Sequence, residues 1–515
     1  MSEVRVRFAP SPTGALHIGG VRTALYNYLY AKKYHGKMIL RIEDTDQSRF
    51  IEGAENYITD TLKWLSITPD ESPETGGDFG PYRQSERKGM YHQYVQQLID
   101  EGHAYYAFDT PEELEAMRER LKTAGVASLH YNAITRAQMK NSLTLSEDEV
   151  NAKLEAGDAH VIRLKVPQKE EVRLNDMVRG WVKVHSSAID DKVLMKSDGM
   201  PTYHLANVVD DHLMKITHVI RGEEWLPSAP LHVLLYKFLG WEDTMPQFAH
   251  LPLLLKPDGN GKLSKRDGDK HGFPVFPIEG NFPGKDGKTE KFNGFREAGY
   301  LPDALVNFLA FLGWNPGSEQ EIYSIEELVE AFSIERIGKA GARFDIEKAR
   351  WFNEQYIKTK SGEELAKYLK KDLDNNHIAY NESKLPQICN ALKERVTFPS
   401  DFWNDGRFFF ERPVEYDQKL IKKKWTEEAV MIIEAFKSAL VKLDGISPEE
   451  AKSTLNNILE EKGVKIGRVM QAIRLAITGA GSGPDLMEII NILGPAECAE
   501  RMTVAIKTLP VKQEN

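Results

Sequence analysis

The sequence is poor in cysteine and has no excess of positive charge. Cys389 and Cys498 are the only cysteines among 515 residues, so the sequence predicts neither a disulfide framework nor a cysteine-rich zinc site, and favours a reducing, cytoplasmic location. Lys and Arg total 67 against 77 Asp and Glu, which gives a net charge of −10. Any nucleic acid must therefore be bound by local patches rather than by the overall field.

Long apolar runs and the common nucleotide motifs are also absent. The N-terminus has no apolar segment of signal-peptide length and no run of about 18 apolar residues follows, which predicts neither a signal peptide nor a membrane span. Neither GxxxxGK[ST] nor GxGxxG occurs. The chain contains 41% hydrophobic and 28% charged residues, a globular composition, and its length predicts roughly three or four domains at about 150 residues each.

The first 46 residues predict a strand, a helix and a second strand. Apolar residues alternate with arginines over 4–8, and a turn rich in Pro and Gly follows at 9–14. Apolar spacing predicts a helix over 18–34, with Gly36 as its stop, and an apolar strand over 38–42 leads into an acidic cluster. This βαβ unit predicts an open parallel sheet, in which ligands bind beyond the carboxyl ends of the strands.

The middle of the chain predicts an insertion. Residues 85–192 mix helical periodicity, as over 111–122, with strand patterns, as over 161–166, and the signals of a nucleotide site stop before them and resume after them. Residues 267–294 hold six Gly and three Pro among charged residues, which predicts an irregular, mobile loop.

Helical patterns dominate from about residue 356, for example over 427–440 and 466–477. Three lysines at 422–424 precede Trp425, a candidate patch for RNA, although a run of lysines on a solvated surface is the simpler interpretation.

Two short segments point to phosphate chemistry. His17, Gly19 and Gly20 open the first predicted helix, where glycines let a polyanion approach and free backbone N–H groups can bind it. Alone, a histidine at such a turn is more often a helix cap. Residues 262–266 (KLSKR) carry three cations in five positions, which alone would be an ordinary basic surface.

In this order, however, the two segments resemble the paired signatures of class I aminoacyl-tRNA synthetases. Within that class the sequence is similar to glutamyl-tRNA synthetases of the bacterial and organellar type. The resemblance covers most of the first 270 residues, in the segments 7–14 (RFAPSPTG), 40–46 (LRIEDTD), 80–87 (GPYRQSER), 194–212 (LMKSDGMPTYHLANVVDDH) and 219–225 (VIRGEEW).

The resemblance implies an α/β fold: a Rossmann-type parallel sheet split by an inserted α+β domain and followed by an all-α anticodon-binding region. The expected parts are a split catalytic domain (1–84 and 193–255), an acceptor-end binding insertion (85–192), a linking domain with the Lys-x-Ser-Lys loop (256–355), and two helical anticodon-binding subdomains (356–425 and 426–515). A glutaminyl enzyme would instead be expected to end in a β-barrel.

The implied activity is ligation of glutamate to tRNA(Glu) through a glutamyl-adenylate, with release of pyrophosphate. A second carboxylate on the substrate requires fixed cations and donors in its site. By resemblance, glutamate is held by Arg7, Ser11, Glu43, Tyr203, Asn207 and Arg221. The structural alternatives are an ion pair between Arg7 and Glu43 and an ordinary core position for Tyr203.

The implied co-substrate is ATP, with Mg²⁺ as its counterion and no dedicated protein cage for the ion. His17 and Lys265 are the expected catalytic residues. The expected ATP contacts are His17, Gly19, Gly20, Glu224, Trp225, Lys262, Ser264, Lys265 and Arg266. In this family the fourth residue of the motif is often not histidine, so Gly20 is a modest departure that leaves the phosphate contacts to His17 and to backbone N–H groups. The segment 105–109 lacks the cysteines that hold zinc in some relatives, so no zinc is expected.

The expected partner is tRNA(Glu), and the expected form is a monomer without a membrane contact. Arg395 aligns with an arginine that relatives use to read the third anticodon base, which predicts an enzyme that charges tRNA(Glu) alone. The alternatives are a non-discriminating enzyme that also charges tRNA(Gln), a catalytically idle RNA-binding relative, and an adenylyltransferase for a small molecule.

Overall fold

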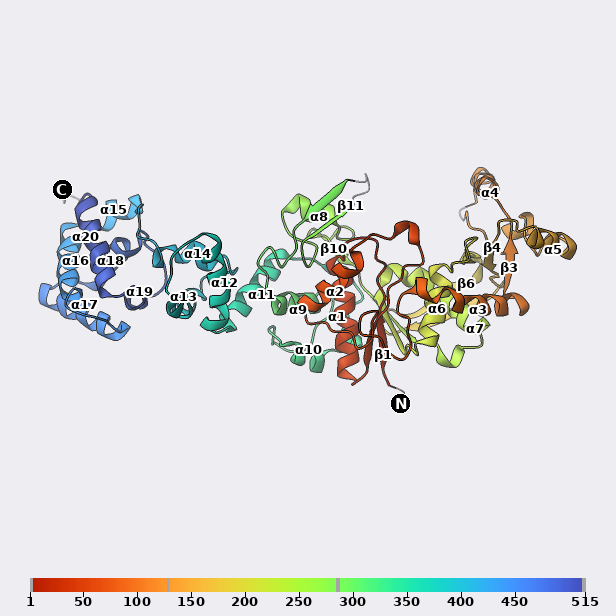
Figure 1. Ribbon diagram of the computed structural model, residues 1–515, viewed down its shortest axis with the longest axis horizontal. Helices are drawn as coiled ribbons and strands as arrows, with labels where there is room; N and C mark the ends of the chain where they lie inside the picture. Colours follow the sequence, from red (N-terminus) through yellow and green to blue (C-terminus); the bar gives the residue numbers. More distant parts are fainter. Residues whose placement is uncertain (1–2, 127–128, 284–287, 512–515) are drawn as a thin grey trace. The chain divides into compact units, whose positions relative to one another are not determined.

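The structure, a computed structural model, describes residues 3–126, 129–283 and 288–511 (Figure 1). The chain divides into two compact units. The first spans Met1–Ala298 and Leu305–Ile346, and the second spans Gly299–Ala304 and Glu347–Asn515. Within the described ranges, no helix combines the length and apolar character needed to cross a bilayer.

A four-stranded parallel sheet organises the first unit, as the sequence predicts. Its strand order is β2 (Lys37–Leu40), β1 (Arg5–Phe8), β8 (His218–Gly222) and β9 (Gln247–Leu251). All four positions of β1 are buried, because its arginines are paired rather than solvated; Arg5, for example, donates to Glu71 at 2.8 Å. The carboxyl ends of these strands meet at one edge of the sheet, where the site is built.

Helix α1 (Ile18–Lys33) connects β1 to β2 and packs against both, which confirms the predicted strand, helix and strand. The helix ends before Gly36, and it is His35 that takes the left-handed conformation, with φ of 51°. Gly36 is needed for a different reason: a Cβ at this position would collide with the backbone carbonyl of Val4.

The first unit also contains further helices and a separate pair of parallel strands. They are α2 (Ala54–Trp64), α6 (Tyr203–Leu213), α7 (Ala229–Phe238), α9 (Pro302–Ala310), α10 (Ile325–Ala331) and the parallel pair β10 (Leu254–Leu255) and β13 (Ala342–Arg343).

The segment between β2 and α6 adds an antiparallel sheet and a hairpin. The sheet comprises β3 (Ala104–Ala107), β4 (Val161–Leu164) and β7 (Val193–Met195), the hairpin comprises β5 (Glu171–Asp176) and β6 (Gly180–His185), and the helices are α3 (Lys88–Asp100), α4 (Pro111–Thr123) and α5 (Glu147–Glu155). One apolar cluster includes Leu164 of β4, Leu205 of α6 and Val219 of β8, so this segment shares a core with the parallel sheet. Strand β5 also contacts β9, which places Asp176 at the end of β5 beside His250 on β9.

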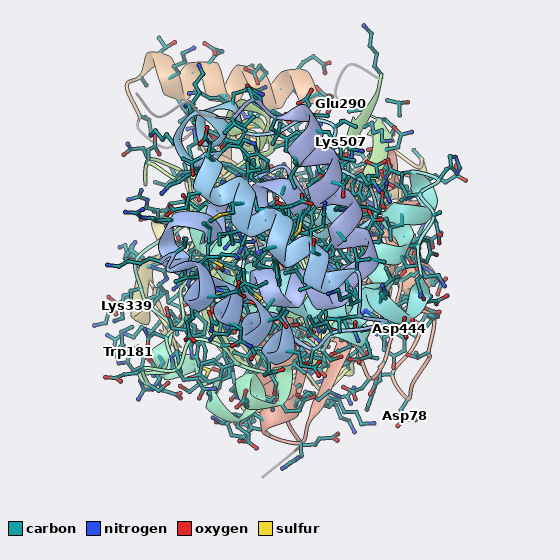
Figure 2. The ribbon with its side chains drawn as sticks, turned by 90° about the vertical axis from the view of Figure 1, so that its left-hand side faces the viewer. Asp78, Trp181, Glu290, Lys339, Asp444 and Lys507 are labelled. Carbon is teal, nitrogen blue, oxygen red and sulfur yellow. The ribbon has the colours of Figure 1, made fainter. Side chains whose placement is uncertain are left out.

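The prediction of an irregular, mobile loop over 267–294 is wrong for the residues of this range that the structure describes. Helix α8 (Lys265–His271) is followed by an antiparallel hairpin of β11 (Gly280–Pro283) and β12 (Thr289–Phe292), the strand that carries Glu290 (Figure 2); residues 284–287 lie outside the described ranges. The hairpin is held by aromatic packing, since Tyr57 of α2 contacts the rings of Phe282 and Phe292. Gly280 suits this packing, because a Cβ at this position would collide with Phe292.

The second unit is helical throughout its described residues, in agreement with the periodicity of the sequence. Its helices are α11 (Ile346–Thr359), α12 (Gly362–Asn375), α13 (Leu385–Leu392), α14 (Asp401–Gly406), α15 (Gln418–Lys424), α16 (Glu427–Leu440), α17 (Pro448–Lys462), α18 (Ile466–Thr478), α19 (Leu486–Leu493) and α20 (Pro495–Thr508). Trp425 is completely buried, so its ring belongs to the core and cannot stack on an RNA base.

Candidate active site at the carboxyl edge of the parallel sheet

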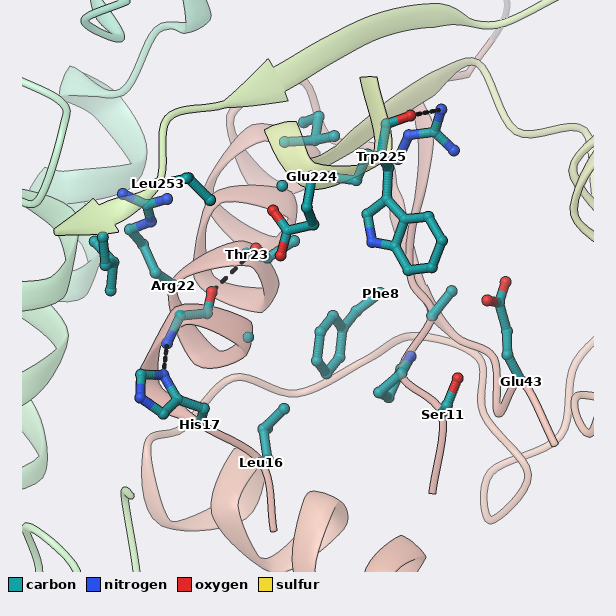
Figure 3. Close-up of a pocket in the computed structure, with 18 of the residues that line it drawn as sticks. Phe8, Ser11, Leu16, His17, Arg22, Thr23, Glu43, Glu224, Trp225 and Leu253 are labelled. Atoms are coloured by element: carbon teal, nitrogen blue, oxygen red, sulfur yellow. Dashed lines mark hydrogen bonds between the residues drawn. The ribbon is translucent and has the colours of Figure 1, made fainter. Parts of the chain in front are cut away.

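A cavity of about 430 Å³ opens beyond the carboxyl ends of β1 and β8 (Figure 3). Its walls come from the turn after β1, the first turn of α1, the start of α6 and the segment after β8. All six residues expected to hold glutamate line this cavity: Arg7, Ser11, Glu43, Tyr203, Asn207 and Arg221.

Arg221 is a buried cation with neutral partners. Its Nε donates to Nε2 of His250 at 3.0 Å, one terminal nitrogen donates to the hydroxyl of Tyr203 at 2.8 Å, and the other approaches the carbonyl of Trp225 at 3.4 Å. Among the described residues, no carboxylate lies within ion-pairing distance of its guanidinium, although only 5% of Arg221 is exposed. A buried and unpaired charge is costly, so this arginine is set to receive an anion.

Arg7 is held differently, by a carboxylate. Its Nε donates to both oxygens of Asp211, at 3.1 and 3.3 Å, while Arg41 donates to the same carboxylate at 2.7 Å. Burial alone would raise the pKa of Asp211, but Arg7 and Arg41 hold it below its usual value. The pairing fixes the Nε side of Arg7, and Arg7 also lines the cavity.

Glu43 is clamped from two sides. One of its oxygens accepts from Arg41 at 3.0 Å and from the amide of Asn207 at 3.1 Å. Burial raises the pKa of Glu43, against the opposing effect of Arg41 and Arg7. Tyr203 and Asn207 share one face of α6, as their spacing predicts, but the Asn207 amide is engaged with Glu43.

Arg41 and Asp211 are site residues that the sequence analysis did not identify. Both lie inside the segments that carry the family resemblance, and both are almost fully buried. The available signal was the occurrence of charged residues within apolar runs, because such charges are buried only when they are paired.

His17 is the N-cap of α1, and its ring is oriented by the backbone. Its Nδ1 accepts from the N–H of Gly19 at 3.1 Å (Figure 3), so the proton of the neutral ring resides on Nε2. Nε2 is buried and has no hydrogen-bond partner among the described residues. Burial, and secondarily Lys262, lowers the pKa of His17 to about 4, so the ring is a neutral donor at physiological pH.

Two lysines of the basic segment 262–266 line cavities, and each pairs with a different carboxylate. Lys262 pairs with Glu224 at 2.9 Å, and both line the cavity beside His17. Lys265 forms an ion pair with Glu290 of β12, in an adjoining cavity of about 500 Å³ that Gly19 and Gly20 also line.

Two expected ATP contacts, Ser264 and Arg266, lie outside both cavities. The hydroxyl of Ser264 donates to Asp267 at 2.6 Å and caps α8, and Arg266 is exposed. Trp225 is a cavity residue whose ring lies 4.4 Å from that of Tyr203. Arg395 is exposed just after α13, in the second unit. Over the described ranges, no group of three or more His, Cys, Asp or Glu side chains is placed to hold a metal ion.

Comparison with known proteins identifies the family. The family model for the catalytic domain of class I tRNA synthetases (E and Q) matches residues 3–274 and 285–351, and that for an anticodon-binding domain matches 362–506. A glutamate–tRNA ligase from Cytophaga hutchinsonii is 63% identical over 511 residues, which are 99% of this chain and 98% of the relative. The chain belongs to the glutamate–tRNA ligase family.

Other members of the glutamate–tRNA ligase family extend the similarity. The enzyme from Amoebophilus asiaticus is 60% identical and covers 98% of each chain. A crystal structure of the glutamate tRNA ligase from Elizabethkingia meningosepticum, in complex with its amino acid, superposes with a TM-score of 0.92 at 49% identity, over 99% of this chain and 100% of the other. The family resemblance and the fold class expected from the sequence are thereby confirmed.

Proposed function

We propose that the protein is a glutamate–tRNA ligase that activates L-glutamate with ATP and transfers it to the 3′ end of tRNA(Glu). Full-length similarity to glutamate–tRNA ligases supports the reaction, and the observation that carries the substrate assignment is the pair of arginines in one cavity. Glutamate carries two carboxylates and one ammonium group. Arg7 and Arg221 supply two cations, and Glu43 supplies the anion for the ammonium group.

Activation needs no nucleophile from the protein. An oxygen of the substrate α-carboxylate forms a bond with the α-phosphorus of ATP, and the bond from that phosphorus to the bridging oxygen breaks as pyrophosphate leaves. The protein therefore acts by positioning the two substrates and by stabilising charge on the phosphate oxygens.

His17 and Lys265 are the residues that we assign to this charge. The unpartnered Nε2–H of His17 is a preorganised donor, and Lys265 is a cation at the same cavity wall. Gly19 and Gly20 leave the start of α1 open to a phosphate, and Glu224, Trp225 and Lys262 line the remainder of the proposed ATP site. Ser264 and Arg266 would reach ATP only if the basic segment moved.

The proposed metal is Mg²⁺ that arrives with ATP as its counterion and needs no dedicated protein cage. When bound, Mg²⁺ neutralises part of the charge on the phosphates and keeps most of its waters. We also propose a cytoplasmic monomer, on the strength of the sparse, buried cysteines and of a site built within one chain.

Transfer requires tRNA, for which the second unit and its match to an anticodon-binding model provide support. We propose tRNA(Glu) as the only tRNA charged, with Arg395 as a reader of the anticodon. The alternative is an enzyme that also charges tRNA(Gln).

The deciding experiment is charging of total bacterial tRNA with ATP and labelled glutamate, with labelled glutamine in parallel, followed by separation of the charged species. Glutamate on tRNA(Glu) alone is the expected result. Glutamate on both tRNAs would establish the non-discriminating alternative, and no charging with either amino acid would favour an idle RNA-binding relative.

A further inference from the structure

A chain of three buried side chains extends from the cavity into the core behind it. Arg221 on β8 and His250 on β9 are register partners in adjacent parallel strands, and Asp176 ends β5, which packs on β9. The Nε of Arg221 donates to Nε2 of His250 at 3.0 Å, and Nδ1 of His250 lies 2.6 Å from an oxygen of Asp176. The side chains of His250 and Asp176 are completely buried, and neither lines the cavity.

The hydrogen bonds assign the proton positions in this chain. An arginine Nε is always a donor, so Nε2 of His250 must accept and the ring proton must reside on Nδ1, from which it is donated to Asp176. Burial and Arg221 lower the pKa of His250, whereas Asp176 raises it. The net shift is downward, so the ring is neutral. The other oxygen of Asp176 accepts from the backbone N–H groups of Val178 and Arg179, at 3.0 and 2.8 Å. Asp176 is therefore held without help from Arg221.

This arrangement separates Arg221 from a carboxylate by one neutral ring. The contrast with Arg7 is direct, since Arg7 bonds to the carboxylate of Asp211 with no spacer. A carboxylate in contact with Arg221 would orient the guanidinium equally well, but it would also compensate the charge that attracts an anionic substrate. The imidazole orients Arg221 and leaves its charge uncompensated.

We propose that His250 and Asp176 are positioning residues that hold Arg221 as an oriented, uncompensated cation, and that they thereby set the preference of the pocket for the anionic side chain of glutamate over the neutral side chain of glutamine. The inference rests on the proposed function, in which Arg221 binds a carboxylate of glutamate. Neither residue touches a substrate, so both act through Arg221.

Two kinds of variant test the proposal in charging assays with full-length protein and tRNA(Glu). Asp176→Asn keeps the oxygen that accepts from the backbone but replaces the acceptor of the His250 proton with an NH₂ group. The neutral ring must then carry its proton on Nε2, where it can no longer accept from Arg221. Because Arg221 loses this contact, we expect the KM for glutamate to rise at least about tenfold while the KM for ATP changes less than about twofold.

The matched pair is His250→Gln and His250→Met, which are similar in size and differ in the ability to accept a hydrogen bond from Arg221. We expect the KM for glutamate of His250→Met to exceed that of His250→Gln at least about tenfold, with kcat affected less than about threefold. The ratio of kcat/KM for glutamate to kcat/KM for glutamine should likewise be lower in His250→Met than in His250→Gln. Because both variants alter the same buried position, this comparison remains valid if Asp176→Asn fails to fold.

A double variant separates this inference from the proposed function. If His250 and Asp176 act through Arg221, Asp176→Asn should have no further effect on the KM for glutamate in an Arg221→Gln background. Equal KM values for the two His250 variants would overturn the inference while leaving the glutamate site intact. An unchanged KM in Arg221→Gln alone would instead overturn the assignment of Arg221 to glutamate, and with it the basis of the inference.

Discussion

At the scale of single residues, some charged groups of the site have ion-pair partners and others have none. Arg7, Arg41, Glu43 and Asp211 neutralise one another in a buried network, whereas Arg221 and the Nε2–H of His17 have no anionic partner among the described residues. The network fixes the geometry of Arg7 and Glu43, which line the cavity, and the uncompensated groups provide charge and a donor that only a ligand can satisfy.

Removal of Lys265 tests the charge at the phosphate side. We expect Lys265→Ala to lower the rate of glutamate activation at least about tenfold with little change in the KM for glutamate, because the role proposed for the lysine is to stabilise charge that develops on the phosphates. Pyrophosphate exchange in the presence of tRNA measures this rate. An unchanged rate would remove Lys265 from the mechanism.

The buried histidines predict a loss of stability in acid. Burial lowers the pKa of His204 to about 4, with Lys192 and Arg221 acting in the same direction. Because the ordinary value is 6.5, the unfolded chain takes up a proton between pH 6.5 and pH 4 that the folded chain does not. The contribution of His204 is complete above pH 6.5 and is lost as the pH falls toward 4, by up to about 1.4 kcal/mol per pH unit.

Calorimetric unfolding at pH 7, 6 and 5 checks this prediction. We expect the unfolding temperature of the wild-type chain to fall with pH more steeply than that of His204→Gln, which carries no titrating ring. Parallel curves for the two proteins would show that His204 does not gain a proton on unfolding.

At the scale of elements, the sequence predicts those whose periodicity is unbroken. The helix expected over 427–440 coincides with α16, and the spacing of Tyr203 and Asn207 correctly places both on one face of α6. The hairpin of β11 and β12 was missed because its glycines and prolines are typical of loops, while the aromatic contacts that stabilise it come from a distant helix. Contacts between distant segments explain why the partners of Arg41, Asp211 and His250 were not assigned. Asp211 on α6 accepts from Arg7 and Arg41, and His250 meets Arg221 through the register of β8 and β9.

The hairpin supplies Glu290 to Lys265, and this contact predicts an effect on ATP binding. The pair is partly exposed, so it contributes about 0.2–1 kcal/mol, and a phosphate must displace Glu290 before it can bind Lys265. We expect Glu290→Gln to lower the KM for ATP by about 1.4-fold to 5-fold. Glu279→Gln is the matched control, since Glu279 pairs with Lys291 at 3.8 Å and does not contact Lys265. A KM for ATP that is equal in the two variants would contradict this role of Glu290.

At the scale of the whole molecule, the chain joins a unit that holds the cavity to a helical unit with an anticodon-binding match. The domain boundaries finer than these two units remain predictions. Composition indicated several domains, but it could not show that the segment 85–192 shares an apolar core with the parallel sheet, since that core is assembled from residues distant in sequence.

The proposed choice of tRNA belongs to this scale, because the proposal links an anticodon contact in the second unit to chemistry in the first. Arg395 is exposed and has the donors to read a base edge, but its charge also attracts any phosphate. Reading of a base predicts that Arg395→Gln relaxes the preference for tRNA(Glu) over tRNA(Gln) at least about tenfold in kcat/KM. A phosphate contact would instead weaken charging of both tRNAs equally and lower its salt dependence. Parallel charging of purified tRNA(Glu) and tRNA(Gln) at two salt concentrations therefore distinguishes the roles, and Lys393→Gln serves as a control for a nearby charge that we do not assign to base reading.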